Sequence, residues 1–388
     1  MNVLLCPLSD PGYLYPVLAA GRELRRRGHT VQVLGGPEAA PAVTAAGLDP
    51  AAVAGRAALS VTHWTVRGSE QYAAVAGAVR ALRPDVLVTS VLNHGALVAA
   101  EAAGLPVVVL GLAAHLWPYR TGPDDGCGRA WRLAQTLKHY TALREGAGLA
   151  PRRDRFPDTP LLGTAFLLRG HPVMEVPGAE LPPAVRHVGP CWWEPAPPVP
   201  EPLPAAGPVA YVHLGRTFGG SSLWPRLNAA FTSGTYRAVV ELGRSGVPEA
   251  APGARLAIGR RAWMGPLVER ADLVLTNATS APVLAALLYG KPLLVAPNGS
   301  EQQVLAAACL RAGVARRLPD AGADAAALRG AVEDTGRDPG LCARVREVGG
   351  LLADGKSAAR AAHPQESAAP RTPPRTPPAG PAAEGPRA

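Results

Sequence analysis

The chain has few aromatic residues, very few lysines and no paired cysteines. Aromatic residues make up 5% of its 388 residues, and only three of the 39 basic residues are lysine. The five cysteines are scattered along the chain without a Cys-x-x-Cys pair. This spacing argues against a disulfide framework and against a cysteine-based zinc site, so a protein of the reducing cytoplasm is expected.

Long uncharged apolar runs are also missing, although 47% of the residues are hydrophobic. A membrane-spanning helix needs about 20 apolar residues, and the best candidate, residues 96–114, is interrupted by Glu101. Residues 1–6 carry no basic segment before a short apolar run, so we interpret them as a buried strand rather than a secretory signal. The net charge is +9, but the basic residues are interspersed, which disfavours a nucleic-acid partner.

Short apolar runs alternate with amphipathic stretches, as is typical of an α/β protein. Residues 3–6 form a predicted strand, a helical pattern begins at Pro16 and stops at Gly28, and residues 30–36 form the next strand. This order predicts a parallel pair with a right-handed crossover. Because the pattern recurs over residues 86–110, we expect a doubly wound domain with its functional groups at the carboxyl ends of the strands.

Proline marks the predicted boundary between two such domains. Eight of the 42 prolines lie between Pro190 and Pro208, which indicates a stiff, extended linker. The α/β alternation resumes after this linker and is lost from Lys356 onward, where Arg-Thr-Pro-Pro occurs twice. The predicted organisation is therefore an N-terminal Rossmann-like domain, a linker, a C-terminal Rossmann-like domain and a disordered tail, over residues 1–189, 190–208, 209–355 and 356–388.

Four segments carry a resemblance to a known family. They lie in residues 12–31, 181–195, 213–216 and 271–302, and they include Gly-Tyr-Leu-Tyr-Pro, His-Val-Gly-Pro, His-Leu-Gly-Arg and Glu-Gln. In order and spacing they resemble the GT-B glycosyltransferases, specifically the UDP-glycosyltransferase-like group that modifies microbial natural products. The resemblance covers about residues 1–350 and implies a cleft between the two domains.

The resemblance implies that the C-terminal domain binds a nucleotide sugar, with UDP or dTDP as the nucleotide. The family's phosphate loop reads His-Gly-Gly-x-Gly-Thr, and residues 277–282 replace its glycines. We expect this loop to face the interdomain cleft at a helix N-terminus, where backbone N–H groups and the helix dipole favour phosphate. The implied donor-binding residues are Arg216, Thr217, Trp263, Asn277, Ala278, Thr279, Ser280, Glu301 and Gln302.

Individual roles follow from the same alignment. Arg216 replaces a small hydroxyl residue at a strand end, and a guanidinium there, or at Arg260 and Arg261, would compensate for the lost glycines. Trp263 would stack on the base. A carboxylate and an amide at residues 301 and 302 suit neighbouring sugar hydroxyls. For the arginines a solvated surface role stays open, and for Trp263 a core role.

The family's catalytic His–Asp pair is missing. Tyr13 stands at the position of the His and Ser90 at that of the Asp, and neither is a ready base at neutral pH. Replacement candidates are Asp10 in the first loop, His94 just after Ser90, and His115 after the next strand. The candidate catalytic residues are therefore Asp10, Tyr13 and His94, although each also fits a turn or a helix cap.

We thus expect a hexosyltransferase-type enzyme of antibiotic biosynthesis and secondary metabolism that is inverting and acts on a small acceptor. No bound cofactor is expected, and no metal ion either, because the sequence shows no Asp-x-Asp motif or His/Asp cluster. Two alternatives stay open: a non-catalytic GT-B relative that binds a ligand or partners an active glycosyltransferase, and a nucleotide-sugar epimerase. A homodimer is compatible with either.

Overall fold

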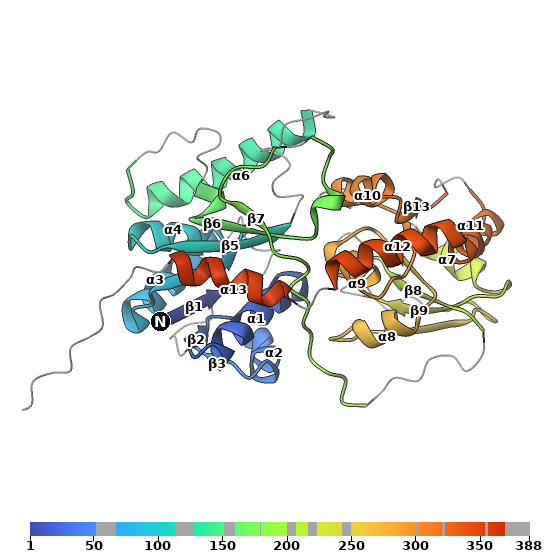
Figure 1. Ribbon diagram of the computed structural model, residues 1–388, viewed down its shortest axis with the longest axis horizontal. Helices are drawn as coiled ribbons and strands as arrows, with labels where there is room; N and C mark the ends of the chain where they lie inside the picture. The colour runs from blue at the N-terminus through green and yellow to red at the C-terminus, as the bar shows by residue number, and fades with distance from the viewer. Residues whose placement is uncertain are drawn as a thin grey trace, which may run out of the picture.

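The protein is described by a computed structural model with one parallel α/β sheet in each half of the chain (Figure 1). It describes residues 1–51, 67–112, 127–150, 160–178, 180–199, 207–215, 223–242, 250–298, 302–319, 323–353 and 356–368. The predicted pair of Rossmann-like domains is confirmed.

The N-terminal sheet has seven parallel strands in the order β3-β2-β1-β4-β5-β6-β7. They are β1 (Asn2–Cys6), β2 (Thr30–Val33), β3 (Asp49–Pro50), β4 (Val86–Ser90), β5 (Val107–Leu112), β6 (Ala165–Arg169) and β7 (Val185–His187). The helices are α1 (Pro11–Arg26), α2 (Ala40–Ala45), α3 (Gly68–Leu82), α4 (His94–Ala102) and α6 (Cys127–Gly146), with the short 3-10 turns η1 (Pro37–Ala39), η4 (Pro160–Leu162) and η5 (Pro172–Met174). Since helices cover both faces of such a sheet, β4 and β6 are buried throughout.

The C-terminal sheet has six parallel strands in the order β10-β9-β8-β11-β12-β13. They are β8 (Val209–His213), β9 (Arg237–Glu241), β10 (Leu256–Gly259), β11 (Leu273–Thr276), β12 (Leu293–Val295) and β13 (Ala315–Arg317). Its helices are α7 (Trp224–Ala230), α8 (Gly265–Arg270), α9 (Ser280–Leu288), α10 (Gln302–Arg311), α11 (Ala325–Arg337) and α12 (Pro339–Leu352). In both sheets the strand order reverses beside the first strand, and ligands of such folds bind outside the carboxyl ends at this point.

The last described helix corrects the predicted tail. Residues 356–368 were expected to be disordered, but α13 (Ser357–Ala368) is a helix that lies across the N-terminal domain beside α1, apart from α12 (Figure 1). Ala361 and Ala362 are fully buried in the N-terminal core. The prediction failed because small alanines, not large apolar residues, make this contact. Residues 369–388 lie outside the described part.

The predicted linker has no regular secondary structure over residues 190–199, and residues 200–206 lie outside the described part. Its first half is held by contacts to both domains. The Glu194 carboxylate accepts hydrogen bonds from Met264 N at 2.8 Å and Gly265 N at 2.5 Å, at the start of α8. Trp193 packs edge-on against Tyr15 of α1 with 5.6 Å between ring centroids. The linker thus fastens the C-terminal domain to the first helix.

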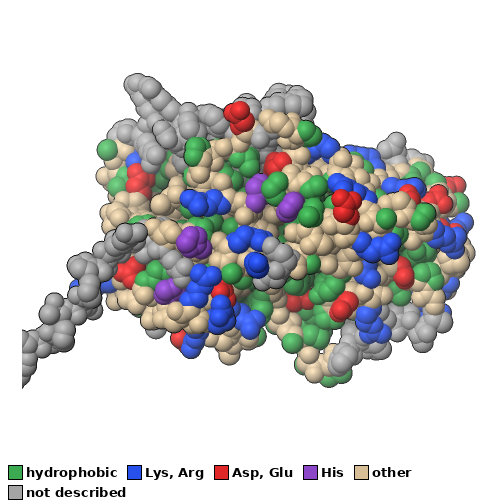
Figure 2. All heavy atoms as spheres, in the orientation of Figure 1, with side chains coloured by type: hydrophobic (Ala, Val, Ile, Leu, Met, Phe, Trp, Pro, Cys, Tyr) green, Lys and Arg blue, Asp and Glu red, His purple; other side chains and the backbone are tan. Residues whose placement is uncertain are grey.

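The surface charge is dispersed. On the face shown in Figure 2, Lys and Arg side chains are spread over both domains and alternate with acidic and apolar side chains. Within the described ranges, no helix is long and apolar enough to cross a bilayer.

The burial of α13 predicts a stability effect that a disordered tail would not produce. Ala361→Glu should lower the free energy of unfolding by about 3 kcal/mol, because it forces a larger, charged side chain into a packed core. His363→Glu, on the exposed side of the same helix, is the matched control and should change it by less than about 0.5 kcal/mol. Urea denaturation followed by circular dichroism measures both. Equal effects of the two substitutions would contradict the docking of α13.

Candidate active site

A pocket lies between the two domains, and of the predicted site residues that the structure describes, Ser280 lines it. Its space of about 530 Å³ is partly open to solvent, and it is lined by the carboxyl ends of β5, β6 and β7, by η5, and by α9 and α10. We call it the interdomain pocket. Its polar side chains are Arg169, His171, Glu175, His187 and Ser280. Most of the remaining lining is aliphatic, so the pocket combines an apolar body with a few polar groups, as small-molecule sites do.

The predicted phosphate loop lies between β11 and α9. Asn277 Nδ2 donates to Leu214 O at 2.8 Å, and Asn277 Oδ1 accepts from Thr279 N at 3.4 Å. The Asn277 side chain is therefore used to join this loop to the end of β8, where Gly215 is close enough that a Cβ atom would collide with Nδ2. Ala278 has φ +63° and is fully buried. An alanine thus holds the left-handed backbone conformation that glycine adopts without strain.

The start of α9 faces the other domain. Thr279 is the N-cap residue, and Ser280, the first residue of the nine-residue helix, lines the interdomain pocket. The Thr279 side chain does not cap the helix, and its buried Oγ1 has no hydrogen-bond partner in the described part of the chain. The first backbone N–H groups of a helix and its dipole favour an anion. Of the predicted loop 277–282, Ser280 is thus the residue that lines the interdomain pocket, at the start of a helix.

Gln302 is the member of the predicted sugar-binding pair that the structure describes. Gln302 is fully buried at the start of α10, and its Oε1 accepts from Asn298 N at 2.9 Å. Gln302 Nε2 is buried without a partner among the described residues. Arg216, Thr217 and Glu301, together with His115 on the N-terminal side, lie outside the described residues.

The segment before α8 contains Trp263. Its ring is partly buried, and its Nε1 is buried without a described hydrogen-bond partner. The neighbouring Ala262 O accepts from Tyr15 Oη of α1 at 2.9 Å. Arg261 is already engaged, because its backbone N donates to the Glu241 carboxylate at 3.0 Å and its guanidinium is 3.8 Å from it. Arg260 is exposed.

The first loop brings two of the predicted catalytic residues to the carboxyl end of the N-terminal sheet. Asp10 is the buried N-cap residue of α1, and its backbone carbonyl accepts from Tyr13 N and Leu14 N, both at 2.8 Å. Its side chain does not cap the helix. Tyr13 is half-buried in the first turn. Ser90, at the end of β4, is buried.

His94, the third predicted catalytic residue, is enclosed between α4 and α6. It is 1% exposed, and its ring lies edge-on to Tyr140 with 5.8 Å between centroids. Burial, together with a smaller effect of the charge of His139, lowers the pKa of His94 to about 3. The ring is therefore neutral at physiological pH. It does not line the interdomain pocket, and its geometry favours the structural interpretation.

Arg169 is the residue that the sequence interpretation missed. It ends the strand Ala-Phe-Leu-Leu-Arg, lines the interdomain pocket and is 6% exposed. Its Nε donates to Pro190 O at 3.1 Å and an Nη to Gly12 O at 2.9 Å. The sequence contains a signal for this residue, because Arg169 is a charged residue at the carboxyl end of an otherwise apolar strand.

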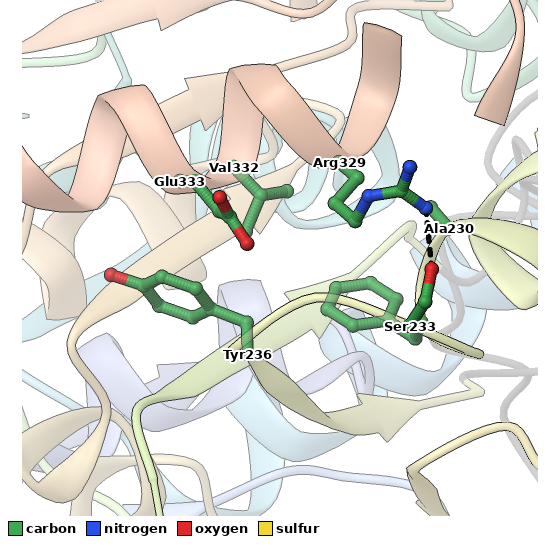
Figure 3. A pocket seen from close by; sticks show the side chains of 7 residues that line it. Ala230, Ser233, Tyr236, Arg329, Val332 and Glu333 are labelled. Atoms are coloured by element: carbon green, nitrogen blue, oxygen red, sulfur yellow. Dashed lines mark hydrogen bonds between the residues drawn. The ribbon is translucent and has the colours of Figure 1, made fainter. Parts of the chain in front are cut away.

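A second cavity is smaller and lies elsewhere. It holds about 180 Å³ between α7, the start of β9 and α11 (Figure 3). Arg329 donates to Ser233 Oγ at 2.6 Å across its mouth, and Tyr236 precedes β9. This position is at the amino end of the C-terminal sheet, opposite the edge where such folds bind ligands. In the described ranges, no group of three or more His, Cys, Asp or Glu side chains is placed to hold a metal ion.

The architecture is shared with proteins of known structure. No protein-family model matches the chain. The crystal structure of the glycotransferase of kitacinnamycin is similar over 95% of this chain and 99% of its own, with a TM-score of 0.75 and 24% identity. The chain has the GT-B glycosyltransferase fold. Another GT-B structure, that of glycosyltransferase VinC in complex with dTDP, covers 94% of this chain and 100% of its own, with a TM-score of 0.64 and 19% identity.

A sequence relative agrees with the GT-B assignment. The chain is 29% identical to 4'-demethylrebeccamycin synthase of Lentzea aerocolonigenes over 261 residues, which are 58% of this chain and 59% of that protein. The match therefore spans less than two thirds of that relative's length. Both the relative and the solved structures are natural-product glycosyltransferases, so the resemblance seen in the sequence is confirmed.

The strained backbone at Ala278 predicts that glycine is the more stable residue there. Ala278→Gly should raise the free energy of unfolding by about 1 kcal/mol, because it removes the left-handed strain of a residue with a Cβ atom. The matched control is Ala285→Gly within α9, which should lower it by about 1 kcal/mol. Chemical denaturation measures both. A loss of stability in both variants would contradict the assigned backbone conformation.

The environment of His94 predicts a pH effect. Its pKa is depressed in the folded state, so below the ordinary pKa of about 6.5 the unfolded chain binds a proton that the folded chain does not. Stability should therefore fall as pH drops from about 6.5 toward 3, by roughly 1.4 kcal/mol per pH unit from this residue. His94→Leu should remove this slope in urea denaturation curves measured between pH 7 and pH 5. An unchanged slope would show that the residue is not buried as a neutral ring.

Proposed function

We propose that this protein is a glycosyltransferase that moves a sugar from a nucleotide sugar to a small natural-product acceptor in the interdomain pocket. The observation that carries the proposal is the start of α9, where Ser280 lines a pocket whose other wall belongs to the N-terminal domain. The similarity to natural-product glycosyltransferases over 95% of the chain supports the same assignment.

The C-terminal domain supplies the donor site. The developing negative charge on the leaving diphosphate would be stabilised by the backbone N–H groups of Ser280 and Ala281 in the first turn of α9 and by the dipole of this helix. Ala278 has the left-handed backbone conformation that glycine adopts without strain. The buried, unused donor of Gln302 is suited to a sugar hydroxyl, and Trp263 to the nucleobase.

The nucleotide is proposed from the neighbours. The VinC structure was solved in complex with dTDP, and we therefore propose a dTDP-linked or UDP-linked sugar as the donor. Helix-dipole stabilisation of the diphosphate does not depend on a divalent metal ion, so a metal-independent transfer with inversion is the mechanism that we propose.

The N-terminal domain supplies the acceptor side. Asp10 and Tyr13 lie in the first loop and first turn of α1, where the family has its base. Either group would take the proton of the acceptor hydroxyl as the new glycosidic bond forms. A carboxylate accepts a proton more readily than a neutral phenol does, so Asp10 is the stronger candidate among the described residues. His94 is set aside because its ring is 1% exposed and packs edge-on against Tyr140.

The test is a calorimetric titration with dTDP, UDP and GDP, followed by donor hydrolysis and transfer assays on a panel of phenolic acceptors. At least one nucleotide should bind, and Ser280→Asp should weaken its binding at least tenfold, because the added carboxylate repels phosphate. Ser69→Asp adds the same charge to the exposed first turn of α3 and should leave binding unchanged.

Two outcomes would reject this function. If none of the three nucleotides binds at millimolar concentration, the donor site is wrong. If a nucleotide binds but no sugar is transferred or hydrolysed across the panel, the protein is the non-catalytic GT-B relative that the sequence left open.

A further inference from the structure

Arg169 is a buried cation that lacks a counter-charge in the described part of the chain. Its two hydrogen bonds go to the neutral carbonyl groups of Pro190 and Gly12. No described carboxylate forms an ion pair with it, and its neighbours Tyr13 and Cys191 are neutral in their ordinary protonation states. A guanidinium has five N–H donors, and these bonds use two of them.

A buried guanidinium without a negatively charged partner lowers the stability of the folded state. Moving a charge out of water is compensated only when it is paired and hydrogen-bonded. Burial lowers the pKa of Arg169 to about 10, which leaves the guanidinium protonated at neutral pH. A cation kept in this position therefore favours any ligand that brings a negative charge into the interdomain pocket.

The other residues that line the interdomain pocket indicate which class of anion it would bind. Leu112, Met174, Leu284, Leu305 and Ala308 make most of the surface apolar. The remaining polar side chains are His171, His187, Ser280 and the single carboxylate Glu175, which forms no ion pair with Arg169. A guanidinium pairs with a carboxylate through two parallel hydrogen bonds, and the aliphatic walls beside Arg169 suit an apolar body attached to that carboxylate.

We propose that the interdomain pocket takes an acceptor that carries an ionised carboxylate on an apolar scaffold, and that Arg169 binds this carboxylate. The inference rests on the proposed function, because it places the acceptor against the N-terminal domain and the donor at α9. It names the substrate class of that site.

The experiment uses a matched pair of probes, 6-hydroxy-2-naphthoate and 6-hydroxy-2-naphthamide, which differ in charge but hardly in shape. Their dissociation constants are measured on the full chain by titration calorimetry, together with that of dTDP. The wild type should bind the acid at least tenfold more tightly than the amide. Arg169→Met should bring this ratio to about one, and Arg169→Lys should keep part of it, because a lysine retains the charge but not the planar fork.

Arg344→Met is the matched control. Arg344 also donates its Nε to a backbone carbonyl, Ala312 O at 2.9 Å, but it belongs to α12 on the C-terminal domain and does not line the interdomain pocket. It should leave the acid-to-amide ratio unchanged. If Arg169→Met does not fold, the acid-to-amide ratio of Arg169→Lys is compared with that of the wild type, and it should be smaller.

Three results would overturn the inference. The first is equal binding of the acid and the amide by the wild type, and the second is a preference for the acid that substitutions of Arg169 leave intact. The third is a loss of dTDP binding in Arg169→Met with an unchanged acid-to-amide ratio. That result would assign the guanidinium to the diphosphate. An acid preference that depends on Arg169 in a protein that binds no nucleotide would instead reject the proposed function and keep the carboxylate site.

Discussion

The guanidinium of Arg169 joins three segments that meet at the cleft. It ends β6, and its bonds to Gly12 O and Pro190 O fix the first turn of α1 and the first residue of the linker to the same strand end. This turn contains Tyr13 and follows the N-cap residue Asp10, and the linker carries Glu194, whose carboxylate accepts from two backbone N–H groups at the start of α8. One buried charge thus sets both the position of the proposed acceptor groups and the point at which the second domain is attached.

On the proposed donor side, backbone conformation rather than a buried charge positions the loop before α9. Asn277 joins this loop to the end of β8, Ala278 has a positive φ, and Ser280 is the first residue of the helix. The loop lacks the glycines of the family motif, yet Ala278 holds a left-handed conformation that costs a residue with a Cβ atom local strain. Its residue types alone therefore do not indicate the backbone conformation of this loop.

Most of the fold could be predicted from the sequence, because buried parallel strands are short apolar runs such as residues 3–6 and 86–88 and the crossovers between them are right-handed. The phosphate loop could also be placed, since it depends on chain order after a strand. Arg169 and His94 could not be assigned, because their roles depend on long-range contacts: a proline carbonyl 21 residues away for one, and the ring of Tyr140 for the other. The helix α13 was missed for a related reason, as Ala361 and Ala362 become core residues only through contact with a distant sheet.

The docking of α13 gives the two domains a second covalent connection. The chain passes from the first domain to the second through the linker that begins at Pro190, and after α12 it returns to the first domain, where α13 packs against α1. A body held by two separate tethers cannot twist freely about either one, and its least restricted movement is rotation about the line that joins them. If the cleft opens and closes, we therefore expect a hinge-like motion about one axis.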